Sequence, residues 1–566
     1  METWKEIATY LKRGVRTVRR WEREEGLPVH RHLHKKLGTV YAYKAEVDAW
    51  WASRGAKLGT QPEEPEGASP RRLWLSVGAT GLAVLLAAGY LLWRQLAPSP
   101  PEGVERIMLV VLPFENLSGD PAQDYLSDGF TEEVITELGS VDAERLGVIA
   151  RTSAMQYKQT TKTVEVIGKE LGVDYLLEGS LRAEGDRLRV NAQLIRVGDQ
   201  THVWAERYDR PMQDVLELQQ DVARNIATAI HLQLSPGPAA AAAGAGSVKP
   251  EAYEAYLRGR SLWHTRTVAG FEQAIPEFER AIELEPDFAR AYAGMADCYA
   301  LLGSYNALPM REAQAQAKAW AHRALTLNPQ AGEVYASLGQ LYDYEWNWEQ
   351  AERHFQRAVE LGPNYATGHQ WYAEHLALMG RTEEALREAR LARELDPLSP
   401  ATHWVVGAVL YYGRRQEEAL RELESTAMLF PDAPLSYLHL GLAYVQAQQY
   451  DRAISTLGKG RELVSDDPEL AALQAYAYGK AGRRKQARGI LRELKLKAER
   501  RSVPPFFIAV AHLGLGESET ALQWLERAYL AGDWQLAVLQ VEPMFDPLRE
   551  RADFQALLRR MNFPGQ

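Results

Sequence analysis

The chain has 566 residues and a net charge of −10, so it is too long for one hydrophobic core and several domains are expected. A single cysteine, Cys298, excludes an intramolecular disulfide framework. Residues 1–57 hold 13 Lys and Arg against 7 Asp and Glu, a balance of +6, whereas the remainder carries −16. This asymmetry favours a polyanionic partner for the first segment only.

Residues 1–57 are predicted to form two short helices, a hairpin and a closing helix. Apolar residues recur at helical spacing from Trp4 to Leu11, and a second helix is expected over residues 15–25. Alternation around residues 37–38 predicts a hairpin, and a last helix is expected over residues 44–53. Basic residues at spacings of three and four share one face of the second helix: Arg16, Arg19, Arg20 and Arg23.

This order of elements resembles the winged helix-turn-helix of MerR-like regulators and excisionases, on the segments WKEIATYL, VRTVRRWEREEGLP and GTVYAYKAEVDAW. The resemblance implies binding of double-stranded DNA by residues 1–57, with the second helix in the major groove. The chain departs from the family at Lys12, where glycine is usual, and at Gly14, where an N-cap residue is usual. Both changes should loosen the turn.

The predicted DNA-binding residues are Arg16, Thr17, Arg19, Arg20 and Arg23 on the second helix and Arg31, Lys35 and Lys36 on the wing. The alternative is a solvated helix whose arginines pair with Glu22, Glu24 and Glu25. His30, His32 and His34 would share one face of a wing strand, but no cysteine lies nearby, and on a basic wing such residues more often face phosphates. We therefore predict no metal and no cofactor.

Residues 58–72 are rich in Gly, Pro and Glu and predict a flexible linker. Residues 73–93 contain 21 residues without a charged side chain and predict a single transmembrane helix, because that length rises about 31 Å. More basic residues precede this stretch than follow it, which predicts a bacterial inner-membrane protein with a cytoplasmic N-terminus and a periplasmic C-terminal region. Ala79, Ala83 and Ala87 would favour a homodimer, although alanine is common in membrane spans.

Residues 104–235 alternate between strand and helix patterns, which predicts an α/β domain. The motifs VLPFENLSGD, YLSDGFTEEVITEL, ELGVDYLLEGSLR and WAERYDR resemble the TolB-like domain of bacterial envelope and sensor proteins. That resemblance implies sensing of a protein or ligand. Asp124, Asp128 and Glu132 share a helix face, but no histidine, nucleophile or metal-ligand cluster accompanies them in the sequence. They indicate partners of the helix dipole, and we predict no enzyme activity.

A low-complexity linker over residues 236–250 leads into a repeated sequence over residues 252–535. Four prolines, Pro329, Pro363, Pro397 and Pro431, are each 34 residues apart, and the best copy has the tetratricopeptide pattern. About eight copies predict an all-α solenoid whose concave groove binds a protein or peptide. Residues 536–566 predict a C-terminal capping helix.

Together these elements predict a membrane-anchored, one-component transcription regulator. Its cytoplasmic DNA-binding head would be coupled to a sensing and protein-binding region outside the inner membrane. The layout is similar to the ToxR/CadC class of membrane regulators. The alternative is an envelope scaffold that gathers partner proteins on its repeats and whose head does not bind DNA.

Overall fold

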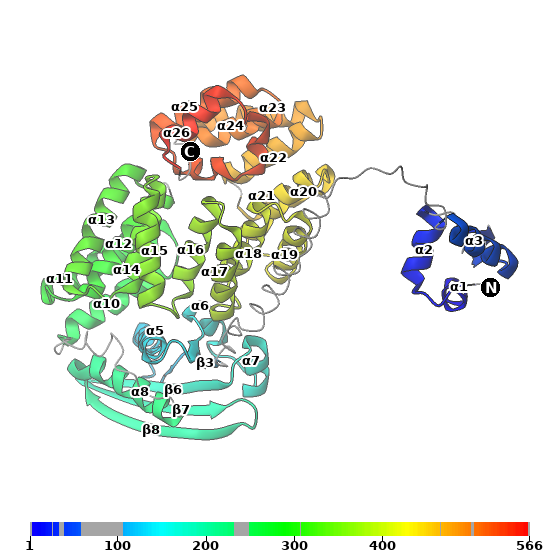
Figure 1. Cartoon of the computed structure of the whole chain (residues 1–566). Coiled ribbons are helices and arrows are strands. Elements are labelled where there is room, and N and C mark those ends of the chain that lie inside the picture. Colours follow the sequence, from blue (N-terminus) through cyan, green and yellow to red (C-terminus); the bar gives the residue numbers. More distant parts are fainter. Residues whose placement is uncertain are drawn as a thin grey trace, which may run out of the picture. The chain divides into compact units, whose positions relative to one another are not determined.

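The computed structural model describes residues 3–24, 27–32, 39–57, 106–230, 248–305, 307–464, 466–499 and 503–563. The chain divides into two compact units, Met1–Pro101 (unit 1) and Glu102–Gln566 (unit 2) (Figure 1). Each unit has its own hydrophobic core.

Unit 1 contains helices on either side of a short hairpin. Its elements are α1 (Trp4–Tyr10), α2 (Val15–Glu24), β1 (His30–His32), β2 (Thr39–Tyr41) and α3 (Lys44–Lys57). The two strands pair antiparallel, with His30 opposite Tyr41. Ile7, Val18 and Val47 come from the three helices, are fully buried and meet in one core. The apolar face of each helix therefore packs against the other helices of unit 1.

The turn between α1 and α2 contains the first departure from the family pattern. Lys12 has a φ angle of +50°, in the left-handed region that glycine enters without a steric cost. A non-glycine residue there costs about 1 kcal/mol. The positive φ angle of Lys12 is therefore the physical reason to expect a less stable turn than glycine would give.

The predicted fold class and location require correction because both depend on a membrane-spanning helix. Within the part of the chain that the structure describes, no helix is long and apolar enough to cross a bilayer. The longest described helices, α5 (Asp124–Val141) and α13 (Met310–Leu327), have 18 residues each and carry charged side chains. The single-pass inner-membrane topology is therefore not retained. Residues 73–93, with the proposed dimer stripe of Ala79, Ala83 and Ala87, lie outside the described residues.

Residues 106–230 form a six-stranded mixed sheet with helices on both faces. The strand order is β5 (Leu146–Val148), β3 (Ile107–Val111), β6 (Tyr175–Glu184), β7 (Arg187–Arg196) and β8 (Thr201–Pro211), and β4 (Glu115–Asn116) pairs with β6. β3 runs parallel to β5 and β6, and β7 is antiparallel to β6 and β8. α5 and α8 (Val215–Ala229) cover one face, whereas α6 (Arg151–Ala154) and α7 (Val164–Leu171) cover part of the other. Strands and helices alternate along these residues, as the α/β pattern of the sequence predicts.

Residues 250–531 confirm the predicted tetratricopeptide solenoid, with eight helix pairs among the described residues. The pairs are α10 (Pro250–Trp263) and α11 (Val268–Leu284), α12 (Ala289–Ser304) and α13, α14 (Gly332–Tyr344) and α15 (Trp348–Leu361), α16 (Ala366–Leu378) and α17 (Thr382–Leu395), α18 (Pro400–Tyr412) and α19 (Gln416–Leu429), α20 (Leu435–Gln446) and α21 (Tyr450–Leu463), α22 (Pro468–Lys480) and α23 (Arg484–Ala498), and α24 (Pro505–Gly514) and α25 (Ser518–Ala531). The first helix of each pair contacts the first helix of the next, so these helices form the inner, concave layer. Gly339 is required in α14, because an added Cβ would lie 2.8 Å from the Phe355 ring.

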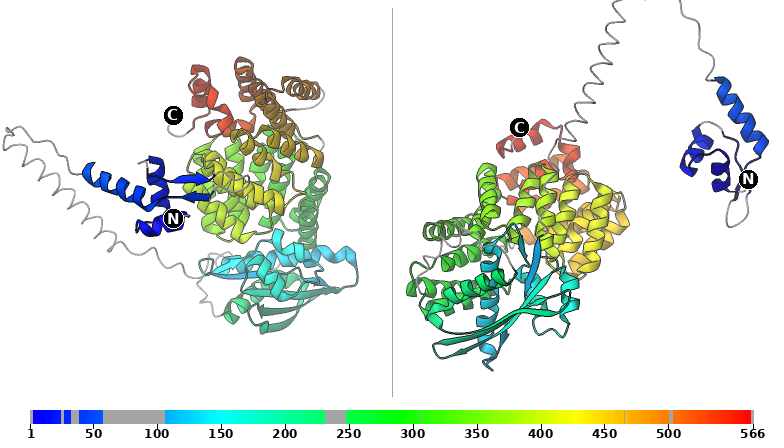
Figure 2. Two further views of the ribbon diagram at one scale, coloured as in Figure 1. Left: turned by 90° about the vertical axis from the view of Figure 1, so that its right-hand side faces the viewer. Right: turned by 60° about the horizontal axis from the view of Figure 1, so that its bottom comes forward.

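The C-terminal residues continue beyond the last pair as η4 (Trp534–Gln540), η5 (Pro543–Leu548) and α26 (Ala552–Arg560). η4 contacts α14 and α16, which are helices of the inner layer far back in the stack. The segment predicted as a capping helix therefore begins as two 3-10 helices that return toward the middle repeats. Figure 2 shows the sheet of unit 2 lying beside the repeats in both views.

Candidate functional site

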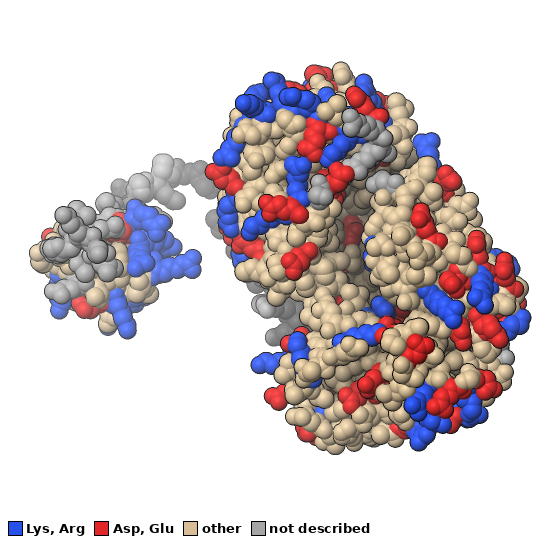
Figure 3. All heavy atoms as spheres, turned by 180° about the vertical axis from the view of Figure 1, so that it is seen from behind, with Lys and Arg blue, Asp and Glu red and all other residues tan. Residues whose placement is uncertain are grey.

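The arginine stripe of α2 lies on the face opposite the core of unit 1. Arg16, Arg19, Arg20 and Arg23 are exposed, and Thr17 is partly buried in the first turn of the helix. The Arg19 guanidinium lies 5.2 Å from the centroid of a tryptophan ring of α1, that of Trp4. Lys and Arg side chains gather on one side of unit 1 (Figure 3). The structure thus brings the five predicted residues of the second helix together.

The alternative interpretation, a stripe paired with neighbouring glutamates, finds little support at two positions. Among the residues that the structure describes, neither Arg16 nor Arg23 forms an ion pair with a carboxylate. Both side chains therefore present charge that a phosphate or a guanine edge would satisfy. The arrangement suits nucleic-acid binding, which remains a prediction.

The wing is described only in part. The Arg31 backbone pairs with Val40 in the hairpin, whereas the Arg31 side chain, Lys35 and Lys36 lie outside the described residues. His30 Nε2 lies 2.7 Å from Oε2 of Glu46, and its ring stacks on Tyr41 at 5.3 Å. No cluster of three or more metal-ligating side chains occurs among the described residues.

In unit 2, the concave layer of the first repeats is occupied by α5 of the same chain. Glu132 forms an ion pair with Arg260 of α10 and lies 2.9 Å from Nε2 of His264, the residue that follows this helix. Glu133 pairs with Arg290 of α12. Burial alone would raise the pKa of Glu132. The charge of Arg260, together with His264 and Arg151, instead holds this pKa well below its usual value. Burial lowers the pKa of His264 to about 4, so this ring is neutral.

Two loops of the repeats also dock on the sheet domain. The Asn364 side chain donates to the carbonyl oxygens of Gly139 and Leu146, at 2.8 and 3.0 Å, and accepts from Arg106 at 2.6 Å. In the loop of the next repeat, Asp396 accepts a hydrogen bond of 2.5 Å from the hydroxyl of Ser153, which belongs to α6 of the sheet domain. Burial raises the pKa of Asp396 to about 6, although hydrogen bonds such as that from Ser153 oppose the rise. The sheet domain and the repeats are therefore joined by buried polar contacts at several points.

The middle of the concave layer is occupied by the C-terminal segment. Trp534 packs on Tyr344 with ring centroids 4.8 Å apart. Tyr411 of α18 donates to Glu542 at 2.5 Å, and Arg414 forms two hydrogen bonds of 2.6 and 2.7 Å with Asp546. The predicted groove is thus filled over these repeats by the protein's own residues.

Glu542 makes this closure sensitive to pH. Burial raises the pKa of Glu542 to about 7, although hydrogen bonds from Tyr411 and the Met544 amide oppose the rise. The folded protein keeps this proton at pH values where the unfolded chain has released it. The contribution of Glu542 to stability is therefore complete below about pH 4.5 and is lost as the pH rises through 7, by at most about 3 kcal/mol.

Urea unfolding of the wild type and of Glu542→Gln between pH 5 and pH 8 measures this effect. The amide keeps the hydrogen-bonding shape but does not titrate, so the variant should gain stability over the wild type as the pH rises. Glu374 and Glu469, with pKa values raised by burial to about 7 and about 8, are common to both proteins and cancel in the difference. A difference that stays constant across this range would contradict the prediction.

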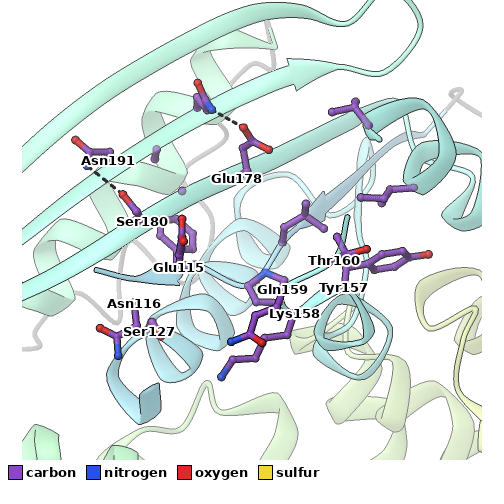
Figure 4. Close-up of a pocket in the computed structure, with 18 of the residues that line it drawn as sticks. Glu115, Asn116, Ser127, Tyr157, Lys158, Gln159, Thr160, Glu178, Ser180 and Asn191 are labelled. Atoms are coloured by element: carbon purple, nitrogen blue, oxygen red, sulfur yellow. Dashed lines mark hydrogen bonds between the residues drawn. The ribbon is translucent and has the colours of Figure 1, made fainter. Parts of the chain in front are cut away.

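A polar cleft of about 960 Å³ opens on the sheet domain. Glu178, Ser180 and Asn191 of β6 and β7 line one wall, and the residue 157–160 turn lines the other (Figure 4). Asn191 donates to Ser180 at 3.1 Å. The cleft lies where α7 ends its cover of the sheet, so hydrogen-bonding side chains of the strands face solvent.

The acidic face of α5 adjoins this cleft. Lys158 donates to Asp128 at 2.8 Å and to Asp124 at 3.1 Å. A hydrogen bond from Asn116 and the Lys158 ammonium lower the pKa of Asp124. Both carboxylates thus serve as partners of one lysine, and Glu132, farther along the helix, serves as a partner of the repeats.

These features define a protein with a basic helical head and a second unit that unites a sheet domain with interaction repeats. Residues 105–225 match the family described as HilA/YgeH-like transcriptional regulator, second domain. Residues 268–332, 336–400 and 415–476 match tetratricopeptide repeat families. The matches indicate a transcription regulator with protein-interaction repeats. The MerR-like and TolB-like assignments are not confirmed.

Similarity to individual proteins is partial. The chain is 39% identical over 200 residues to a protein of Rhizobium meliloti (strain 1021) named putative adenylate cyclase 3. The matched segment covers 35% of this chain and 34% of that protein. The chain thus spans about a third of the length of this curated relative. Among solved structures, pilF of Pseudomonas aeruginosa shows 20% identity over 36% of this chain and 92% of its own, with a TM-score of 0.29. A human IFIT1 dimer shows 16% identity over 56% of this chain and 78% of its own, with a TM-score of 0.35.

Proposed function

We propose that the protein is a DNA-binding transcription regulator in which unit 1 reads DNA through α2 and the repeats of unit 2 bind a partner protein. The observation that carries the proposal is the exposed arginine stripe, opposite the buried face of α2 in a compact unit. The match of residues 105–225 to a regulator family supports it. The proposal includes no catalytic activity, since the matched families are a regulator domain and interaction repeats.

Within this proposal, the two groups of basic residues have different roles. Arg19 and Arg20 lie on the exposed face of the helix, where a planar side chain can pair with a guanine edge. The wing residues Arg31, Lys35 and Lys36 contact phosphates, which position the protein but carry no sequence information. The sheet domain supplies the sensing surface, and its polar cleft is the place for a ligand.

Replacing Arg19 or Arg20 by alanine in the full chain should cost about 1–3 kcal/mol on a duplex selected from random sequences, with little effect on a scrambled duplex. Lys35→Ala should weaken binding to both duplexes alike and lower the slope of log affinity against log salt by about one. Fluorescence anisotropy across a salt series measures both effects. Lys5→Ala, an exposed cation on α1, is the matched control for the stripe.

Glu217→Ala, an exposed residue of α8 that does not line the cleft, should leave DNA affinity unchanged, because the substitution lies in unit 2. If the Arg19 and Arg20 variants bind the selected duplex like the wild type, the stripe is only a solvated face. The envelope-scaffold interpretation would then be preferred.

A further inference from the structure

Four successive outer helices of the solenoid end in exposed aliphatic side chains. Met428 at the end of α19 is 76% exposed, Leu463 at the end of α21 is 42% exposed, Leu496 near the end of α23 is 50% exposed and Leu530 near the end of α25 is 69% exposed. A single exposed leucine is ordinary, but several along one edge of a domain mark an interaction surface. We call this edge the outer ridge.

The same edge already serves as an interface one repeat earlier. Leu395, the last residue of α17, is fully buried. Its carbonyl oxygen accepts from the Ala150 amide at 2.7 Å, and Leu398 donates its amide to Ser153 at 2.8 Å. The sheet domain therefore covers the outer ridge at α17 and leaves it uncovered from α19 to α25.

A row of basic residues runs beside the exposed leucines. Lys459, Arg492 and Arg527 lie one helical turn before Leu463, Leu496 and Leu530 respectively, and all three are exposed. Within the described residues, none of the three cations forms an ion pair with a carboxylate. Lys and Arg side chains are frequent over the C-terminal repeats in Figure 3. Residues 450–531 hold 14 Lys and Arg against 10 Asp and Glu, so the row belongs to a basic part of the otherwise acidic unit 2.

We infer that the outer ridge from α21 to α25 docks an acidic amphipathic helix of a partner protein. An apolar row and a parallel basic row are complementary to a helix with an apolar face and an acidic flank. The ridge leucines lie near the matching ends of successive outer helices, so an apolar face that runs along the partner helix can contact more than one of them. The inference rests on the proposed protein-binding role of the repeats and names the partner's chemistry.

The test uses the full chain and a labelled amphipathic helical peptide with leucines along one face and glutamates beside the leucines. The wild type should bind this peptide with an affinity that falls as salt rises. The triple variant Leu463→Ser, Leu496→Ser, Leu530→Ser and the triple variant Lys459→Glu, Arg492→Glu, Arg527→Glu should each weaken binding at least tenfold. The charge variant should recover binding to a peptide with lysine in place of glutamate. Val166→Ser, an exposed aliphatic residue of the sheet domain, is the matched control.

Failure of the wild type to bind, or equal binding by wild type and both triple variants, would overturn the inference. Competition by a DNA duplex would assign the ridge to nucleic acid instead, and conversion of a dimer to a monomer by the leucine variant would assign it to a second copy. If one triple variant does not fold, the other still decides. DNA binding by unit 1, measured on the same samples, should be unchanged, so a failure of the ridge is distinct from a failure of the proposed function.

Discussion

Glu132→Ala should lower the free energy of unfolding of unit 2 by about 3 kcal/mol and loosen the sheet domain from the repeats. The substitution leaves Arg260 without its partner in an interface where both side chains are less than one-fifth exposed. His264 and Arg151 also lose a carboxylate, at 2.9 and 3.4 Å. Removing one member of a buried ion pair typically costs about 3–5 kcal/mol, and the residual exposure of this pair favours the lower end.

Urea unfolding, together with hydrogen exchange of peptides covering α5 and α10, measures this effect. Exchange should accelerate in both helices, because each loses its partner. Glu144→Ala, an exposed carboxylate that follows the end of α5, should change the midpoint little. Glu132→Gln keeps the shape of the side chain but not its charge, and its unfolding midpoint should lie between those of Glu132→Ala and Glu144→Ala. Wild-type stability in Glu132→Ala would show that the ion pairs do not hold the domains together.

The second large effect is expected for Phe545→Ala. Phe545 of η5 is fully buried, with Phe506 of α24 at 5.8 Å and Phe554 of α26 at 6.1 Å between ring centroids. Truncation removes a ring from the layer that fixes the C-terminal segment and leaves a cavity. The loss of unfolding free energy should be about 3–5 kcal/mol.

The measurement is urea unfolding combined with hydrogen exchange across residues 534–563. Protection should be lost first in η4 and η5, whereas peptides of β6 and β7 should keep theirs. Phe545→Leu, which retains most of the volume, should cost only about 1 kcal/mol. Equal midpoints for the alanine and leucine variants would indicate that the site collapses around the cavity.

Much of the secondary structure could be predicted because its causes are local. The 34-residue spacing of Pro329, Pro363, Pro397 and Pro431 reports the loops of a repeat in which each helix pair contacts its neighbours. Alternation around residues 185–186 likewise reports the β6–β7 hairpin. The stripe of α2 follows from helical spacing alone.

The filling of the concave layer could not be predicted because its partners are distant in sequence. Glu132 and Arg260 are 128 residues apart, and Glu133 and Arg290 are 157 apart. Acidic residues on α5 have no periodic signal that distinguishes a dipole partner from a docking contact. Asn364 follows one of the spaced prolines, so its loop was visible in sequence, but its partners on the sheet domain were not.

The closure of the repeats also determines the order in which the chain can fold. A tetratricopeptide array ordinarily forms from neighbouring contacts and can begin folding anywhere along its length. Here α5 emerges from the ribosome more than 120 residues before α10 and α12, and Trp348 donates to the Met561 carbonyl across 213 residues. At about 5–20 residues per second, the acidic face of α5 is exposed for roughly six seconds or longer, and the tryptophan for roughly ten seconds or longer. Unit 2 should therefore complete its folding only after Met561 has been synthesised, with rates closer to those of a protein of high contact order than to those of an open repeat.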